Sequence, residues 1–231
     1  IPPSLLNCFD DIYHQDWIDD GISIEVMRNN NIKYCVKDHQ IIIPHYYGLD
    51  GRLIGIRCRN LVEETIEKGN KYMPVYLQGM DFAHSLSGNL YGLCRNKNTI
   101  KKLRKAMIVE SEKGVLQCET MYGENNFTVA TCSSNITNIH RDLLLDCGIE
   151  EVILGFDKDF DIDSEDYRKK MKSICRLAKK FLPYVKVYIL EDSEGLLELK
   201  DSPTDKGQEV LENLMKNKIG LTMSLVDAIL E

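Results

Sequence analysis

The fold is decided by the stretch Glu151-Val152-Ile153-Leu154-Gly155-Phe156-Asp157-Lys158-Asp159, together with the earlier run Ala106-Met107-Ile108-Val109-Glu110. Both are short apolar runs that end in carboxylates. Apolar runs of this length, separated by helical patterns, are typical of buried parallel strands in an α/β sheet. Such sheets gather their chemistry at the carboxyl ends of their strands. We therefore expect Glu110, Asp157 and Asp159 to meet at one edge of the sheet.

Three carboxylates at one edge would repel one another. At ~4 Å and an effective dielectric of ~20, each pair costs roughly 4 kcal/mol, so the cluster would need a cation, and Mg²⁺ is the usual partner of hard oxygen ligands. Taken alone, Asp157 and Asp159 favour a solvated loop or a helix cap, where Asp is common. A separate Glu110 at a matching strand end makes the metal site an equal alternative.

Composition sets the broad class of the protein. The chain has 231 residues, 43% of them hydrophobic and 28% charged, which suits one large or two small globular domains. Its apolar runs are too short for a membrane span, and the start has no signal-peptide pattern. Because the chain begins with Ile1 rather than Met, we expect an excised fragment of a longer protein.

The eight cysteines show no CxxC pair, which argues against a zinc ribbon or a redox dithiol. Cys118, Cys147 and Cys175 lie in helical, apolar patterns, where a free thiol behaves as a small hydrophobic side chain. We therefore expect a reducing, cytoplasmic location.

The net charge of −7 is unevenly distributed. Residues 95–105 contain six basic side chains and no acidic one, so the remainder of the chain carries −13. The six basic residues are Arg95, Lys97, Lys101, Lys102, Arg104 and Lys105. This segment is either a phosphate-binding face or a solvated helix face, and composition does not separate the two.

The order of elements predicts three segments. Residues 1–105 read as a mixed α+β subdomain: a helical stretch over 1–40, a hairpin of strands 41–44 and 53–57 around an Asp-Gly turn, an irregular stretch, and the basic segment. Residues 106–195 read as a parallel, doubly wound sheet flanked by helices. Its predicted strands are 106–110, 127–131, 152–156 and 185–190, and its predicted helices are 112–122, 137–147 and 165–182. Residues 196–231 contain two short helical segments, 207–217 and 221–231.

A strand ending in Glu, followed by a helix, a strand, a helix and a strand ending in Asp-x-Asp, resembles the TOPRIM domain of primases, topoisomerases and some nucleases. The preceding residues resemble the bacterial and phage-type replicative primases. The resemblance rests on Ile43-Pro44, Gly51-Arg52-Leu53-Ile54-Gly55-Ile56-Arg57-Cys58-Arg59, Lys71-Tyr72 and Asn89-Leu90-Tyr91-Gly92-Leu93. It covers essentially the whole chain, and it is specific as a set rather than piece by piece.

The resemblance also implies roles for single residues. Glu110 matches the TOPRIM glutamate, although Ser111 stands where glycine is usual, and Asp157 and Asp159 match the Asp-x-Asp pair as catalytic metal ligands. Asp201 resembles a later acidic element and is a further metal-ligand candidate; the wider spacing here speaks against Asp205.

The basic candidates belong to the template and nucleotide path that the resemblance implies. Arg59 and Lys71 match the family's basic residues, and Arg57 is a weaker candidate. Tyr72 would be either a stacking platform or a core residue. The remaining nucleic-acid-binding candidates come from the basic segment and are Arg95, Lys101 and Lys102.

The function that the resemblance implies is synthesis of short RNA primers on a single-stranded DNA template from ribonucleoside triphosphates, with Mg²⁺ or Mn²⁺. It also implies a zinc-binding module and a contact with the replicative helicase in regions outside this chain. Two alternatives stay open: a TOPRIM nuclease that hydrolyses the strand, and a non-catalytic single-strand-binding replication module. No membrane partner is expected.

Overall fold

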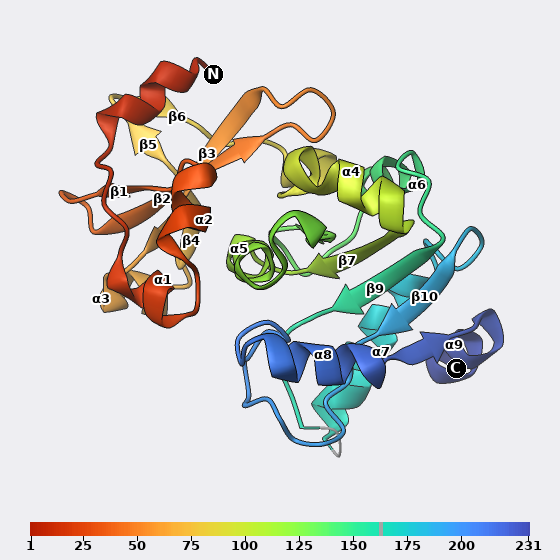
Figure 1. Cartoon of the computed structure of the whole chain (residues 1–231). Helices are drawn as coiled ribbons and strands as arrows, with labels where there is room; N and C mark the ends of the chain where they lie inside the picture. Colours follow the sequence, from red (N-terminus) through yellow and green to blue (C-terminus); the bar gives the residue numbers. More distant parts are fainter. Residues whose placement is uncertain (162–163) are drawn as a thin grey trace. The chain divides into compact units, whose positions relative to one another are not determined.

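The computed structural model describes residues 1–161 and 164–231, which form two compact units, residues 1–85 and 86–231 (Figure 1). The division falls earlier than the predicted boundary after residue 105. The reason is helix α4 (Leu93–Leu103), which contacts strands β7 and β8 of the second unit. Its buried Leu93 and Ile100 belong to the same hydrophobic core as Ala106. The basic segment is therefore part of the second unit.

The described strands of the first unit form a four-stranded antiparallel sheet in the order β1-β2-β3-β4. The strands are β1 (Lys33–Cys35), β2 (Gln40–Tyr46), β3 (Leu53–Asn60) and β4 (Tyr72–Pro74), with a small hairpin of β5 (Tyr76–Leu77) and β6 (Met80–Asp81). The predicted hairpin is present as β2 and β3. Pro44 does not end β2, because β1 pairs only as far as Ile42 and leaves the proline beyond its neighbour.

Residues 1–40 were expected to be helical and are mixed instead. They hold the 3₁₀ helix η1 (Pro3–Cys8), helices α1 (Gln15–Asp19) and α2 (Ile24–Asn29), and strand β1. Ser23 caps α2 by accepting a hydrogen bond from the Val26 N–H. A further short helix, α3 (Glu63–Glu67), follows β3. Trp17, Ile22 and Met27 are buried, whereas Ile24 is exposed.

In the second unit the described residues form a five-stranded sheet in the order β11-β10-β9-β7-β8. Strands β7 (Lys105–Val109), β8 (Thr128–Ala130), β9 (Glu151–Gly155) and β10 (Lys186–Ile189) are parallel, as predicted. Strand β11 (Ile219–Leu221) pairs antiparallel with β10 and was not predicted. The register sets Val109 of β7 against Gly155 of β9, so the chain leaves both strands at the same level of the sheet.

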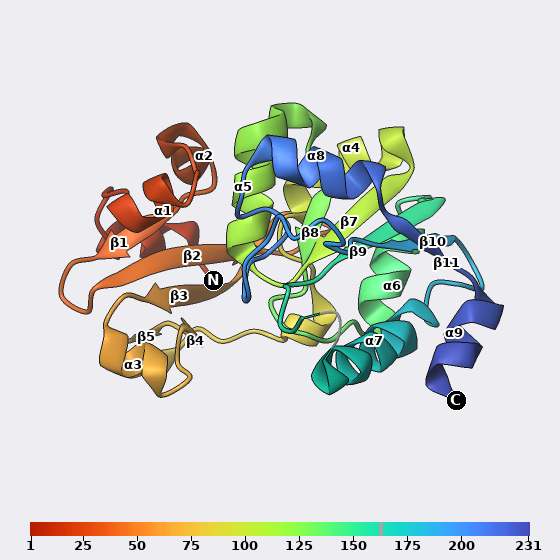
Figure 2. The same cartoon turned by 90° about the horizontal axis from the view of Figure 1, so that it is seen from below.

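Helices cover both faces of this sheet (Figure 2). Helices α5 (Glu112–Tyr122) and α8 (Gln208–Lys216) lie on one face, and α6 (Asn138–Leu145), α7 (Glu165–Ala178) and α9 (Met223–Leu230) lie on the other. Alternate strand residues point to the second face, where Ile108, Val152 and Leu154 join a core with Leu144 and Phe181. The arrangement is the predicted sheet flanked by helices.

Within residues 1–161 and 164–231 we find no helix that is long and apolar enough to cross a membrane. All eight cysteines lie among the described residues as free thiols. Cys118, Cys147 and Cys175 are buried, as predicted. Burial raises the pKa of the Cys118 thiol to about 12, which keeps it protonated and apolar.

Candidate active site

The predicted acidic residues lie at the carboxyl edge of the parallel sheet. Glu110 follows β7 directly, and Asp157 and Asp159 follow β9, the neighbouring strand. The backbone N–H of Asp157 lies 3.4 Å from Oε1 of Glu110 and donates to it. The matched lengths of β7 and β9 therefore bring together two stretches that are far apart in the sequence.

Two lysines neutralise part of this cluster. Lys170, on helix α7, donates from Nζ to Oε1 of Glu110 at 3.2 Å and to Oδ2 of Asp159. Lys200 donates to Oδ1 of Asp159 at 3.0 Å. Partial burial works against the charged form of Asp159, yet these hydrogen bonds hold its pKa below the usual value. Asp159 is therefore a carboxylate at neutral pH.

Asp157 has less compensation, which comes from the nearby charge of Lys170. Its Oδ1 atom is buried and accepts no hydrogen bond from any described residue. Burial first, and then the negative charges of Glu110, Asp205 and Asp159, raise the pKa of Asp157 to about 7. Asp157 is thus the acidic group of this edge whose negative charge is least compensated.

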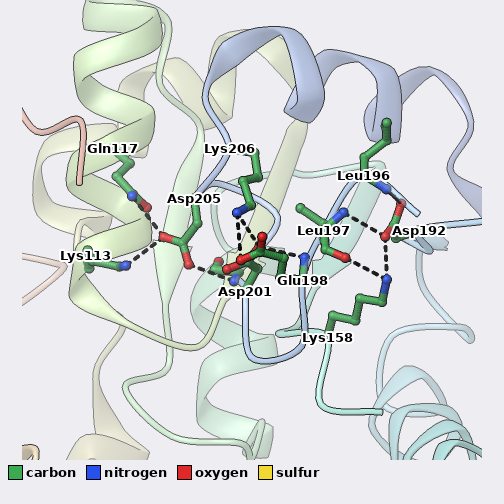
Figure 3. Close-up of polar contacts among 11 residues, drawn as sticks. Lys113, Gln117, Lys158, Asp192, Leu196, Leu197, Glu198, Asp201, Asp205 and Lys206 are labelled. Carbon is green, nitrogen blue, oxygen red and sulfur yellow. Dashed lines mark hydrogen bonds and ion pairs between the residues drawn. The ribbon is translucent and has the colours of Figure 1, made fainter. Parts of the chain in front are cut away.

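Asp205 comes from the loop between β10 and α8 and is tied to helix α5 (Figure 3). It pairs with Lys113 at 2.7 Å, accepts a hydrogen bond from Nε2 of Gln117 at 3.0 Å, and accepts another from the Ser202 N–H at 2.9 Å. Burial opposes its charge, but these donors, Lys113 foremost, hold its pKa below the usual value. Asp205 is therefore a fixed negative charge that acts on Asp157.

Asp201, the predicted metal-ligand candidate from the same loop, makes different contacts (Figure 3). Its carboxylate accepts the Glu198 N–H at 2.8 Å and lies 3.2 Å from Nζ of Lys206. Its backbone carbonyl accepts the Lys158 N–H at 2.8 Å, which fastens the loop to the Asp157–Asp159 segment. The charge that acts on Asp157 comes from Asp205, the residue that the wider sequence spacing had spoken against.

The other predicted basic residues lie in two separate places. In the first unit, strand pairing sets Arg59 opposite Tyr72, and the guanidinium carbons of Arg57 and Arg59 both lie 5.7 Å from the centre of the Tyr72 ring. Nη1 of Arg59 donates to the Tyr72 hydroxyl at 3.4 Å, while its buried Nε has no hydrogen-bond partner among the described residues. Lys71, next to Tyr72, is exposed.

In the second unit the basic residues lie along α4. Arg95, in the first turn, pairs with Glu119 of α5 at 2.9 Å. Lys101 and Lys102 are exposed in the last turn, just before β7 begins. The five residues of β7 separate them from Glu110 by roughly 17 Å. The structure therefore does not bring Lys101 and Lys102 to the acidic edge.

No family model matches the chain. A curated relative, the SPbeta prophage-derived uncharacterized protein YorJ of Bacillus subtilis strain 168, is 46% identical over 227 residues. The match covers 94% of this chain and 60% of YorJ, so the chain spans less than two thirds of that relative's length.

Solved structures resemble the chain over nearly all of its length. The Aquifex aeolicus primase, with its zinc-binding and RNA polymerase domains, matches with a TM-score of 0.71 and 20% identity, over 94% of this chain and 60% of that one. The Escherichia coli primase catalytic core matches with a TM-score of 0.66 and 19% identity, over 99% and 78%. This chain has the fold of a primase catalytic core. A DnaG primase catalytic domain bound to single-stranded DNA matches with a TM-score of 0.67 and 18% identity, over 98% and 78%. The fold that the sequence resemblance implied is confirmed.

Proposed function

We propose that the chain is the catalytic core of a DNA primase, which joins ribonucleotides into short RNA primers on a single-stranded DNA template. The primase-core fold supports this proposal over nearly the whole chain. The observation that carries it is Asp157, whose buried Oδ1 lacks a hydrogen-bond donor and lies among three other acids. A site built only for stability would have supplied that donor.

The residues fit a divalent cation. An orphaned carboxylate oxygen, with Glu110 and Asp159 beside it, is the hard-oxygen donor set that Mg²⁺ or Mn²⁺ prefers. We infer that Glu110, Asp157 and Asp159 hold the ion, which would neutralise phosphate charge and orient the reacting oxygens during nucleotidyl transfer. We infer that Asp205 belongs to the same site, because its negative charge raises the pKa of Asp157. It would act either as a further ligand or only through that charge.

The basic groups of the first unit suit phosphate binding. Arg57 and Arg59 project from the same face of β3, two residues apart, and both lie over the Tyr72 ring. Arg57 is buried, whereas Arg59 is partly exposed, and a guanidinium group over an aromatic ring is a planar group that matches phosphate oxygens. We infer that this pair, with Lys71, grips template or nucleotide phosphates in a salt-sensitive manner.

Primer synthesis by the chain of residues 1–231 tests the proposal. The chain is incubated with Mn²⁺ or Mg²⁺, labelled ribonucleoside triphosphates and a single-stranded template, and we expect short labelled RNA that disappears in Glu110→Gln. Asp227→Asn is the matched control, because it removes one negative charge from an exposed pair with Lys179, the residue that follows helix α7. It is expected to leave synthesis unchanged.

The same assay separates the alternatives. Template shortening without labelled product would contradict the polymerase proposal and indicate a nuclease that uses the same acidic residues. Template binding without any product, unchanged in Glu110→Gln, would indicate a non-catalytic single-strand-binding module.

A further inference from the structure

Lys170 occupies an unusual place for a lysine on an amphipathic helix. Its side chain is 19% exposed, and its ammonium group lies between Oε1 of Glu110 and Oδ2 of Asp159. The ring of Phe156 lies 5.7 Å from the same nitrogen. Its neighbours on α7 make other contacts: Lys169 pairs with exposed Asp166, and Lys172 donates to the carbonyl of Leu230. Helix α7 thus directs the Lys170 ammonium to the acidic edge.

The oxygens that Lys170 contacts are the ones a cation would need. A divalent ion held by Glu110 and Asp159 would bind carboxylate oxygens of the same pair that accepts the Lys170 N–H groups. The other oxygen of Asp159 accepts a hydrogen bond from Lys200, so both oxygens of this carboxylate already face an ammonium group. A divalent ion bound to these oxygens would also be repelled by the positively charged ammonium group beside it. The ammonium group and a divalent ion would therefore compete for these two carboxylates.

We propose that Lys170 is a resident counter-ion of the metal-free site, which competes with the divalent cation for Glu110 and Asp159 and moves away when the cation binds. The proposal rests on the metal site of the proposed function. The four-carbon stem of lysine lets the ammonium swing without moving helix α7. The lysine keeps the carboxylates from repelling one another while the ion is absent, and it sets the ion concentration at which the site fills.

The test measures Mn²⁺ affinity from the free-ion electron paramagnetic resonance signal. Lys170→Met removes the competing charge and is expected to bind Mn²⁺ at least about tenfold more tightly than the unsubstituted chain. Lys169→Met is the matched control, since it changes net charge equally at an adjacent exposed position, and a change of no more than about twofold is expected. Equal or weaker Mn²⁺ binding by Lys170→Met would overturn the proposal.

A second variant and a second readout guard against misfolding. Lys170→Arg keeps the positive charge and can contact both carboxylates, so its Mn²⁺ affinity is expected to equal that of the unsubstituted chain or fall below it; tighter binding would contradict competition. In EDTA, Lys170→Met should melt at a lower temperature than Lys169→Met, and Mn²⁺ should remove that difference.

Asp157→Asn separates the failure of this inference from the failure of the metal site. If the unsubstituted chain binds no Mn²⁺ that depends on Asp157, the metal site is absent and the competition falls with it. If Asp157-dependent binding exists but Lys170→Met does not strengthen it, the role of Lys170 alone is wrong.

Discussion

Two aspartates follow neighbouring strands of the parallel sheet and meet opposite environments. After β10, Asp192 is buried and fully supplied with donors: Nζ of Lys158 at 2.7 Å and the N–H groups of Leu196 and Leu197 at 2.7 and 2.9 Å (Figure 3). Burial opposes its charge, but these donors hold its pKa below the usual value. After β9, Asp157 has a buried oxygen without a donor and a pKa of about 7.

The two carboxylates differ in the donors that the protein supplies to them. At Asp192 the protein supplies the hydrogen-bond donors, and two of them are N–H groups of the loop after β10, so the carboxylate stabilises that loop. At Asp157 three acidic neighbours outweigh the charge of Lys170, and under the proposed function a cation from solution would supply the missing positive charge. The two residues share an edge and a residue type, and their hydrogen-bond donors tell them apart.

The largest expected effect is on catalysis in Asp157→Asn. We expect primer synthesis to fall about a thousandfold or more, because several kcal/mol of charge stabilisation depend on the ion. The folded protein should nevertheless become more stable. The stability contribution of a raised carboxyl pKa is present below pH ~4 and lost as pH rises through about 7, so at pH 8 in EDTA the substitution should add up to about 4 kcal/mol, measured by denaturant unfolding. A loss of stability would contradict the account of Asp157.

Asp192→Asn should change the free energy of unfolding in the opposite direction and destabilise the protein. It leaves the Lys158 ammonium, which is 17% exposed, without its counter-charge, and we expect a loss of about 3 kcal/mol in the free energy of unfolding. Asp166→Asn, which breaks an exposed pair with Lys169, is the control and should cost less than about 0.5 kcal/mol. A stabilised Asp192→Asn would remove the distinction between the two aspartates.

Metal affinity should depend on pH through Asp157. The pKa of Asp157 is about 7, so at lower pH the cation must displace a proton from this carboxyl group. Mn²⁺ affinity should therefore fall about tenfold for each pH unit below that value. Asp159, whose pKa lies below its usual value, contributes nothing to this slope near neutrality. Calorimetry in two buffers of different ionisation enthalpy would count the proton released; no release at pH 6 would contradict the prediction.

The smallest effects separate the two basic regions. Arg59→Lys loses the planar fork over Tyr72 and should weaken binding of single-stranded DNA or nucleotide about tenfold. Lys101→Gln with Lys102→Gln, at the opposite end of β7 from Glu110, should weaken binding only a few-fold, as scattered phosphate contacts do. Fluorescence anisotropy at fixed salt measures both, and the reverse order would place the nucleic acid along α4.

The sequence predicted the parts of the fold that carry strong local signals. The bounds of α5 agree with the predicted helix over 112–122, and the apolar runs of β7 and β9 placed Glu110 and Asp157 at one edge. Strands β4 and β11 were missed, because three residues on an antiparallel edge are too few to show a period.

The candidate site was less accessible to prediction than the fold. The influence of Asp205 depends on how the loop after β10 turns back to Lys113 and Gln117, and its spacing gives no hint of that turn. Lys170 is one of several basic residues on α7, and only the phase of the helix against the sheet shows which of them reaches Glu110. Both are long-range consequences of packing.

The most direct test of the central claim is the pKa of the Asp157 carboxyl group, followed by carbon-13 nuclear magnetic resonance in EDTA with Asp192 as the internal reference. The account predicts that Asp157 titrates near 7, that Asp192 titrates below the usual range for aspartate, and that Mg²⁺ moves the Asp157 titration to lower pH. An Asp157 group that titrates near pH 4 and ignores Mg²⁺ would contradict it.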